Sequence, residues 1–273
     1  MLLTHSTFID WPARVLVEKG AVAIDTEAGA QTLRDIHSDM FIKSLRDLHK
    51  ALAAAAVAEA AVSLERAIFY IGGSAFAGLH TSRRGHVFNA AVYIARKIDA
   101  AVVSIDRDFP RGTWELHLEY KFPLYLIYSG AEGPGVKYIY RRGKGAVAIP
   151  MPPGAGDLSF KKAVDLVLES GGPVVLHLGF DIHREDPTGY FFASENFYYH
   201  LGKSLSSKKF YISLECPSTP AVFKSSLEAL LSGLSGGPPP RASPYREGRD
   251  VVREVEKVIE NVKRSSDRLF RRH

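Results

Sequence analysis

Asp181 lies where a carboxylate is well placed to serve a binding site. It closely follows the apolar residues 173–176, which predict a buried strand. An acid directly after such a strand lies at the carboxyl edge of a sheet, where open α/β folds bind their ligands. The surrounding residues 178–189 read Leu-Gly-Phe-Asp-Ile-His-Arg-Glu-Asp-Pro-Thr-Gly. Asp181 is therefore the first candidate site residue, and the question is which other groups accompany it.

Strand-like and helix-like segments alternate along the chain. The strand-like segments are continuous apolar blocks, a pattern typical of parallel strands that are covered on both faces. We expect strands at about residues 66–72, 101–106, 123–128, 145–150, 173–180 and 209–215. We expect helices at about residues 28–33, 41–63, 88–98, 158–168, 194–206, 220–234 and 249–269. This alternation predicts a three-layer α-β-α domain with a mainly parallel central sheet.

Two segments rich in Gly and Pro interrupt this alternation. Residues 150–157 form a loop ending at Asp157, an acid suited to cap the next helix. Residues 236–249 predict a Gly/Pro-rich connector to a helix at 250–270, in which valines and an isoleucine recur at helical spacing. We therefore expect a single domain over residues 1–273, with this C-terminal helix docked on it.

The composition is that of a soluble globular protein. Hydrophobic residues make up 46% of the 273 residues and charged residues 24%. No apolar run reaches the roughly 18 residues of a membrane span, and no signal peptide is recognised at the N-terminus. The one cysteine, Cys216, excludes an internal disulfide and any multi-cysteine metal site. We expect a cytoplasmic protein without a membrane partner.

Several segments resemble motifs of the histone deacetylase superfamily, which includes acetoin-utilisation proteins and acetylpolyamine amidohydrolases. Residues 178–189 are similar to the family signature Gly-Phe-Asp-x-His-x-x-Asp-Pro-Leu-Gly. Six further segments resemble family motifs in the family's order: residues 4–14, 36–42, 78–89, 103–113, 149–157 and 214–231. The resemblance covers most of the chain and implies the arginase/deacetylase fold.

The resemblance also implies a zinc site from which one ligand is missing. Family members hold zinc with two Asp and one His, and they leave an open position for water and the substrate carbonyl. By position, Asp108 and Asp181 correspond to the two carboxylate ligands. Pro110 falls where the family has its His ligand, and its side chain offers no donor. Two carboxylates without imidazole hold zinc poorly, because zinc sites supply three or four ligands.

The family's acid–base groups are altered in the same way. His80 matches the first histidine of a tandem pair, and Asp106 matches the acid that orients it. Thr81 replaces the second histidine, and Ser218 replaces the tyrosine that stabilises the oxyanion. We expect His80 and Asp106 to form a buried, structural hydrogen-bonded pair. Residues 81–85 form a shortened loop whose role the sequence leaves open.

Three alternatives remain for the inherited acids. Asp108 and Asp181 can pair with nearby arginines without a metal, the candidates being Arg107, Arg111 and Arg184. His86 is a candidate displaced ligand that would restore zinc binding and a metal-dependent amidohydrolase with a rearranged site. Cys216 as a catalytic nucleophile is the least favoured alternative, because a nucleophilic thiol needs a nearby base that the sequence does not show.

The C-terminal tail carries most of the net charge. Residues 241–273 contain 10 Lys and Arg against 6 Asp and Glu, a balance of +4 within the chain's total of +5. Basic residues near a helix C-terminus complement its dipole. The same residues also make a candidate contact with nucleic acid or an acidic partner: Arg264, Arg268, Arg271 and Arg272.

Together these residues favour a histone-deacetylase-like pseudoenzyme with a degenerate zinc site. We expect no cofactor and a role as a binding or scaffold subunit for a protein or ribonucleoprotein partner. Zinc is expected only if the rearranged amidohydrolase site exists. A nucleic-acid-associated protein that binds through its basic tail is the third class.

Overall fold

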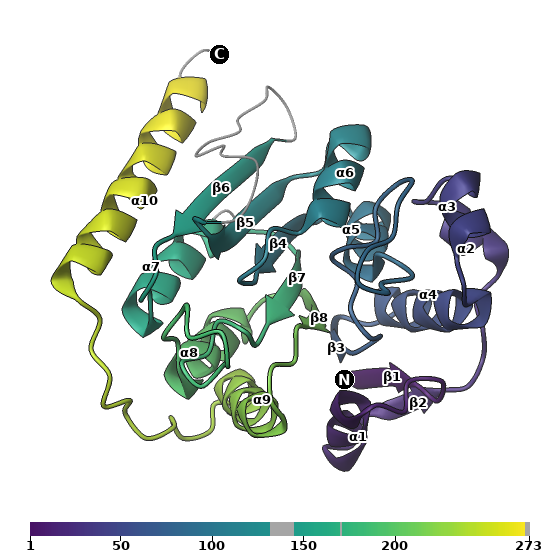
Figure 1. The fold of residues 1–273 in the computed structure, drawn as a ribbon, viewed down its shortest axis with the longest axis horizontal. Coiled ribbons are helices and arrows are strands. Elements are labelled where there is room, and N and C mark those ends of the chain that lie inside the picture. Colours follow the sequence, from purple (N-terminus) through teal and green to yellow (C-terminus); the bar gives the residue numbers. More distant parts are fainter. Residues whose placement is uncertain (132–144, 170, 271–273) are drawn as a thin grey trace.

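A single parallel sheet of eight strands forms the centre of the protein in the computed structural model, which describes residues 1–131, 145–169 and 171–270 (Figure 1). The strand order is β2-β1-β3-β8-β7-β4-β5-β6, and every pairing between neighbours is parallel. The strands are β1 Leu2–His5, β2 Val22–Ile24, β3 Arg66–Phe69, β4 Ala101–Ile105, β5 Leu124–Ser129, β6 Ala146–Met151, β7 Val174–Gly179 and β8 Phe210–Glu215. Strands β7 and β8 are buried at every position, as their unbroken apolar runs predict.

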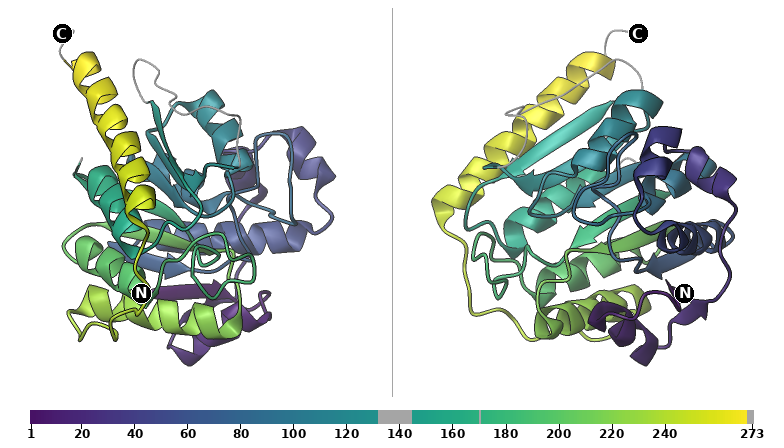
Figure 2. Two further views of the ribbon diagram at one scale, coloured as in Figure 1. Left: turned by 60° about the vertical axis from the view of Figure 1, so that its left-hand side comes forward. Right: turned by 45° about the vertical axis from the view of Figure 1, so that its right-hand side comes forward.

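Helices cover both faces of this sheet (Figures 1 and 2). Helices α4 and α5 pack on one face, where α5 contacts β4, β7 and β8. The other side carries a layer in which α8 packs against α7 and α9, and α9 against α1. The predicted three-layer α/β fold is confirmed. The helices are α1 Trp11–Glu18, α2 Ala30–Arg34, α3 Asp39–Ser44, α4 Leu48–Val62, α5 Ala90–Ile98, α6 Arg111–Tyr120, α7 Asp157–Leu168, α8 Glu195–Leu205, α9 Pro220–Ser235 and α10 Arg249–Phe270.

Four short elements were not expected from the sequence: β1, β2, α1 and α6. Strand β2 has three residues, two of them exposed, so it lacks the apolar block by which the other strands are recognised. The single helix expected at residues 41–63 is wrong. The backbone is extended at Leu45, and the Asp47 side chain accepts a hydrogen bond from the Lys50 N–H, which starts α4 as a separate helix.

Helix α7 is capped by a residue from far along the chain. The Glu247 carboxylate accepts hydrogen bonds from the backbone N–H groups of Gly156, Leu158 and Ser159, at 2.6 to 3.0 Å. The expected cap, Asp157, is instead the first helical residue, and it accepts hydrogen bonds from Ser194. Glu247 therefore ties the connector to the first turn of α7, where a negative charge is stabilised by the helix dipole.

Helix α10 packs along α7 and the edge strand β6 (Figure 1). Val255 is fully buried in this contact and Val262 is nearly so. Lys162 on α7 forms an ion pair with Glu256 on α10. None of the described helices has both the length and the apolar character needed to cross a membrane.

Candidate functional site

Three neighbouring strands end at the same place and bring four candidate donor groups together. Strands β4, β7 and β8 are adjacent and parallel, so their carboxyl ends meet at one edge of the sheet. Asp106 and Asp108 follow β4, Asp181 follows β7, and Cys216 follows β8. One ligand-type atom from each residue lies within 4.8 Å of the others. These four residues are called the acid cluster below.

The last residue of β7 must be glycine for these acids to approach one another. A Cβ atom on Gly179 would lie 2.5 Å from the Asp106 Oδ2 and 2.9 Å from the Asp181 Oδ1. Both distances are too short for a real side chain, so any larger residue would push the carboxyl groups apart. The glycine before the Phe-Asp pair in the sequence thus has a direct structural cause.

Backbone N–H groups in the turn after β4 hold two of the carboxylates in place. The Asp108 N–H donates to the Asp106 Oδ1 at 2.9 Å, and the Arg107 N–H donates to the Asp181 Oδ1 at 3.1 Å. Among the described residues, the buried Asp106 Oδ2 has no hydrogen-bond partner. The acids are therefore fixed in position, and only part of their hydrogen-bonding capacity is used.

Two arginines occupy both oxygens of Asp108. The Arg84 guanidinium binds the Asp108 Oδ2, and the Arg107 guanidinium binds the Asp108 Oδ1 at 3.1 Å. Arg107 also lies 3.7 Å from the Asp181 Oδ2. The Asp108 side chain is 1% exposed, whereas the Arg84 side chain is 51% exposed. A buried carboxylate is thus neutralised by an arginine that reaches in from the surface. Of the arginines expected to pair with these acids, Arg107 does so, while Arg184 contacts Ser243 and Glu185.

Burial makes the other groups of the cluster hard to ionise. Burial raises the pKa of Asp181 to about 7, although the Arg107 backbone N–H and positive charge act in the opposite direction. Burial and the nearby Asp181 raise the pKa of Asp106 well above its ordinary range. Burial, and then the charges of Asp106 and Asp181, raise the pKa of the Cys216 thiol. A thiol with a raised pKa is a poor nucleophile and a poor metal ligand.

The expected pairing of His80 with Asp106 is wrong. His80 is exposed, its Nδ1 lies 2.9 Å from the Ser38 hydroxyl, and its backbone N–H donates to Glu115. Thr81 is also exposed, and its hydroxyl donates to Glu115. The shortened loop turns back on itself through a bridge between Ala77 and Ser82. It therefore delivers Arg84, and no histidine, to the acid cluster.

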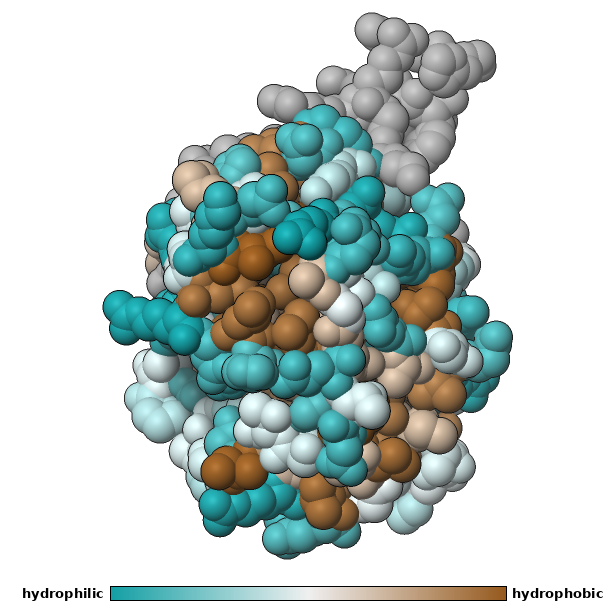
Figure 3. Space-filling model, turned by 90° about the vertical axis from the view of Figure 1, so that its right-hand side faces the viewer, coloured by the Kyte–Doolittle hydropathy of each residue, from teal (hydrophilic) through white to brown (hydrophobic). Residues whose placement is uncertain are grey.

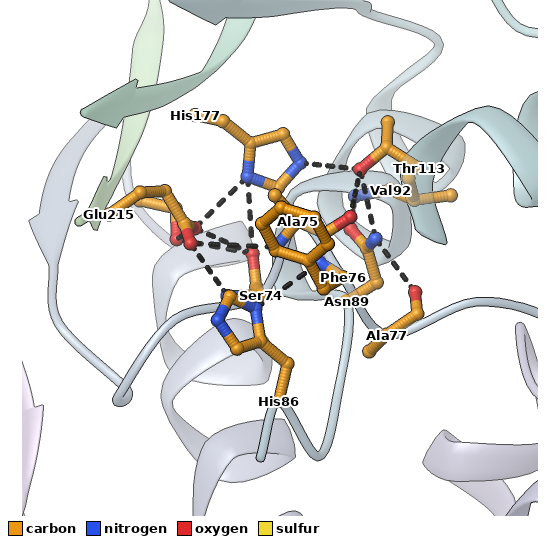
Figure 4. A network of polar contacts seen from close by, with 11 residues as sticks. Ser74, Ala75, Phe76, Ala77, His86, Asn89, Val92, Thr113, His177 and Glu215 are labelled. Atoms are coloured by element: carbon orange, nitrogen blue, oxygen red, sulfur yellow. Dashed lines mark hydrogen bonds and ion pairs between the residues drawn. The ribbon is translucent and has the colours of Figure 1, made fainter. Parts of the chain in front are cut away.

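His86 is not a displaced ligand of the two Asp. Its Nδ1 accepts a hydrogen bond from the Phe76 N–H at 3.2 Å (Figure 4). The ring lies so close to Gly73 that a Cβ atom there would be 2.6 Å from it. Burial lowers the pKa of His86, so the ring is held neutral. The donor atoms that converge in the acid cluster include no imidazole among the described residues.

A second polar cluster lies beside the first and is completely buried (Figure 4). The His177 Nδ1 lies 3.0 Å from the Glu215 Oε1, and its Nε2 lies 3.0 Å from the Thr113 hydroxyl. Ser74 donates to Glu215 through both its hydroxyl and its backbone N–H. Burial opposes ionisation of Glu215, but the hydrogen bond from His177 and the His177 charge outweigh it and lower the pKa to about 2. This group is called the His177 cluster below.

The Thr113–His177–Glu215 order resembles a nucleophile–base–acid triad, but it has no access to a substrate. All three side chains are at most 1% exposed. Thr113 also accepts a hydrogen bond from Asn89 and contacts the Ala75 carbonyl. The cluster therefore joins β7, β8, α6 and the loop before α5, and its role is structural.

The remaining substituted positions offer no catalytic donor to the cluster. Pro110 is the residue before α6. The Ser218 hydroxyl donates to the Asp186 Oδ2 at 2.6 Å, so it is already engaged. Cys216 and Ser218 both have positive φ angles, 35° and 61°, which fixes an unusual backbone path after β8. On this path the Cys216 Sγ lies within 4.8 Å of an oxygen of each acid in the cluster.

Comparison with known proteins places this geometry in a known fold. No protein-family model matches the chain, and no curated protein matches it. The crystal structure of the HDA15 HD domain is similar, with a TM-score of 0.73 and 18% sequence identity. The match covers 94% of this chain and 90% of that chain. The chain has the histone deacetylase fold. The resemblance of the sequence motifs is thus supported at the level of structure.

The acid cluster does not fit the zinc ion that histone deacetylases hold. Both oxygens of Asp108 are already bound by guanidinium groups, and Pro110 supplies no ligand. A cation at this place would have to displace Arg84 from the Asp108 Oδ2. The donor set therefore disagrees with the metal that the fold implies.

Sequence reasoning found the acids of the site but missed Arg84 and the place of Cys216. Arg84 belongs to a loop whose path depends on packing against Phe76, over which its guanidinium lies at 4.5 Å. Cys216 follows β8, so its position could have been found from the strand order alone. His177 lies on the strand before the site, and its partner Glu215 is 38 residues away. Nothing local in the sequence marks that pairing.

Proposed function

We propose that this protein is a non-catalytic member of the histone deacetylase fold that acts as a binding or scaffold subunit. The observation that carries this proposal is the occupation of Asp108 by Arg84 and Arg107. Two guanidinium groups bring the same positive charge as one divalent ion. They satisfy the buried carboxylate that would otherwise need a metal, because a buried charge is stable only when paired.

The groups that would move protons or stabilise an oxyanion are also out of reach. His80 and Thr81 point to Ser38 and Glu115 at the surface, and the Ser218 hydroxyl is held by Asp186. The loss of one oxyanion donor alone typically lowers a rate by about two to three powers of ten. Loss of the metal, the base and the oxyanion donor together supports a protein without hydrolytic activity.

The metal content of the purified protein tests this proposal. After dialysis, elemental mass spectrometry is expected to find far less than one zinc per chain. Arg84→Ala frees one oxygen of Asp108 and is expected to tighten zinc binding by about tenfold, the equivalent of roughly 1.4 kcal/mol. The matched control is Arg83→Ala, because Arg83 is an exposed neighbour with no ion pair among the described residues. It should leave zinc binding unchanged.

Activity assays test the same proposal through catalysis. Acetyl-lysine peptides and acetylpolyamines should not be hydrolysed above the background rate, with or without added zinc. About one zinc per chain, together with zinc-dependent deacetylation that Asp181→Ala abolishes, would contradict the proposal.

A metal-dependent amidohydrolase with a rearranged site is the second candidate. One observation favours it: Asp106, Asp108, Asp181 and Cys216 offer four donor atoms within 4.8 Å. In this alternative Cys216, not His86, would be the added ligand. It predicts that Cys216→Ser lowers zinc binding sharply, whereas the non-catalytic proposal predicts no change from an already weak level.

The surface offers a place for a protein partner. Apolar residues gather on the face that Figure 3 shows, within a surface that is otherwise mostly hydrophilic. Of the eight large apolar side chains exposed in the described part of the chain, six lie in the first 48 residues: Met1, Ile9, Val17, Val22, Met40 and Leu48. An exposed apolar patch often marks an interaction site, so the patch on the face in Figure 3 supports the scaffold role.

Binding of nucleic acid through the C-terminal tail remains the third candidate. Arg264 is exposed on α10 and pairs with Glu260 at 3.4 Å, while Arg271 and Arg272 lie outside the described residues, as does the side chain of Arg268. Salt-sensitive retention on nucleic acid that weakens when these four arginines are neutralised would support it. Retention unchanged by the substitutions would count against it.

A further inference from the structure

A pocket of about 220 Å³ opens beside the acid cluster. It lies between the loop after β3 and the start of α6, and Phe109 links it to Asp108 along the chain. Its lining consists of three aromatic side chains, two arginines and three other residues: Phe76, Phe109, Trp114, Arg83, Arg111, Thr81, Gly112 and Glu115. Neither the acid cluster nor the His177 cluster contributes a side chain to this lining.

The size and walls of the pocket fit a small ring. Drug-sized ligands occupy pockets of about 300–1,000 Å³, and an apolar cavity of about 150 Å³ can hold benzene. At about 220 Å³ this pocket suits a single ring with one substituent. Phe76 and Phe109 are almost fully buried, so the small part of each ring that reaches the pocket is a fixed part of its wall. Trp114 packs on Phe109 with their ring centres 5.9 Å apart.

The charges around the pocket favour an anion. Arg83 and Arg111 are exposed, and their guanidinium groups have no ion pair among the described residues. The Glu115 carboxylate, the one acid in the lining, already accepts hydrogen bonds from the His80 N–H and the Thr81 hydroxyl. The lining residues therefore carry two positive charges and one negative charge that is partly satisfied.

The neighbouring acid cluster does not cancel this positive field. Asp108, the acid nearest to Phe109 in the chain, is bound by Arg84 and Arg107. Arg84 itself lies over the Phe76 ring, between the pocket wall and Asp108. An anion in the pocket is therefore shielded from the buried carboxylates by a guanidinium group.

We propose that this pocket binds a small, flat organic carboxylate. The ring lies against Phe76, Phe109 and Trp114, and the carboxylate accepts charge-assisted hydrogen bonds from Arg83 and Arg111. The proposal deepens the binding role and rests on it, because it needs Arg84 to remain on Asp108 and not to yield to a metal. A cationic ligand of the same size is disfavoured by the same two arginines.

Trp114 provides a direct readout of binding. The chain has two tryptophans, so the background variant Trp11→Phe leaves Trp114 as the single indole. Titration with benzoate should change its fluorescence with saturation. Benzamide, the neutral isostere, and benzylamine, the cation, should bind at least tenfold more weakly, as expected for loss of a charged hydrogen bond. Calorimetry with the unmodified chain repeats the measurement without any substitution.

Substitutions at the two arginines assign the site. Arg83→Gln and Arg111→Gln should each weaken benzoate binding by about tenfold. Arg246→Gln, which changes an exposed arginine on the connector before α10, is the matched control and should have no effect. Equal binding of benzoate and benzamide would overturn the proposal, and so would benzoate binding that neither pocket arginine affects. Absence of saturable binding would do the same.

A metal-free preparation separates this proposal from the proposed function. Protein passed over a chelating resin should bind benzoate as before. If binding is lost with the metal and restored by zinc, the carboxylate binds a metal ion, and both proposals fail. If the protein holds no zinc and does not bind benzoate, the non-catalytic role stands and the carboxylate site alone is refuted.

Discussion

Two polar clusters lie side by side at the carboxyl edge of the sheet, and they satisfy their charges in different ways. The His177 cluster is closed: its histidine and Glu215 are at most 1% exposed and bind one another at 3.0 Å. The acid cluster is open on one side, because its buried Asp108 depends on Arg84, whose side chain is 51% exposed. The first cluster can only hold the fold together. In the second cluster, Arg84 is open to solvent, so a dissolved cation can compete with it for Asp108.

The two clusters differ in which of their members can be replaced. A buried charge whose partner is removed is strongly destabilising, so the closed cluster must keep every member. The open cluster needs only a positive charge beside Asp108. A metal ion or an arginine from a neighbouring loop can supply it. In this protein residues 81–85 bring Arg84 to Asp108, so an arginine supplies that charge.

Removal of the histidine should have the largest effect. His177→Ala leaves Glu215 buried without its main partner and is expected to lower the free energy of unfolding by about 3–5 kcal/mol. Chemical denaturation measures this loss. His49→Ala is the control, because His49 is 86% exposed and pairs with Glu27 at the surface, where a change within about 0.5 kcal/mol is expected. If the two variants lost equal free energy of unfolding, the buried His177 cluster would be no more important for stability than a surface pair.

The two clusters should respond to pH in opposite directions. Glu215 has a lowered pKa of about 2, so its stabilising contribution is present above its ordinary value of 4.5 and is lost as the pH falls toward 2. Asp181 has a raised pKa of about 7, so between its ordinary value of 3.8 and pH 7 the unfolded chain binds fewer protons. Its contribution to stability therefore falls as the pH rises through this window.

The variant Asp181→Asn cannot ionise at this position, so it tests the pH dependence of stability that Asp181 causes. Compared with the unmodified protein, the variant should gain stability steadily between about pH 4 and pH 7, as measured by chemical denaturation at several pH values. Asp250→Asn, at a position that is 99% exposed, should follow the unmodified protein. A constant difference between Asp181→Asn and the unmodified protein would mean that Asp181 is ionised throughout.

Arg84→Ala should have the smallest effect on stability. Its guanidinium is half exposed and Arg107 remains on Asp108, so a loss of about 1 kcal/mol or less is expected. The same variant is expected to bind zinc more tightly. The two clusters should therefore differ in the kind of response to a substitution as well as in the size of the stability loss. A loss as large as that of His177→Ala would show that the acid cluster is as closed as its neighbour.

The sequence allowed the sheet to be predicted because buried parallel strands have a local signature. Unbroken apolar runs such as those of β7 and β8 mark strands that are covered on both faces. Strand β2 has only three residues, two of them exposed, and lacks this signature, which is why it was missed. The break between α3 and α4 depends on one capping side chain, Asp47, inside a stretch that is otherwise favourable for a helix.

The amino-acid sequence by itself determined where the acids lie. Asp106, Asp108 and Asp181 follow apolar strands, and parallel strands present their carboxyl ends at one edge of the sheet. The sequence also determined that position 110 offers no side-chain donor, because a proline has none in any fold. These conclusions need only local patterns and the rules of side-chain chemistry.

The tertiary structure alone decided which partners the buried charges have. Arg84 reaches Asp108 across 24 residues, His177 meets Glu215 across 38, and Glu247 caps α7 from about 90 residues away. Such pairings depend on how loops close over the sheet, and a buried charge selects whichever partner that closure brings near. For this reason His80, placed by motif order beside Asp106, lies at the surface with Ser38.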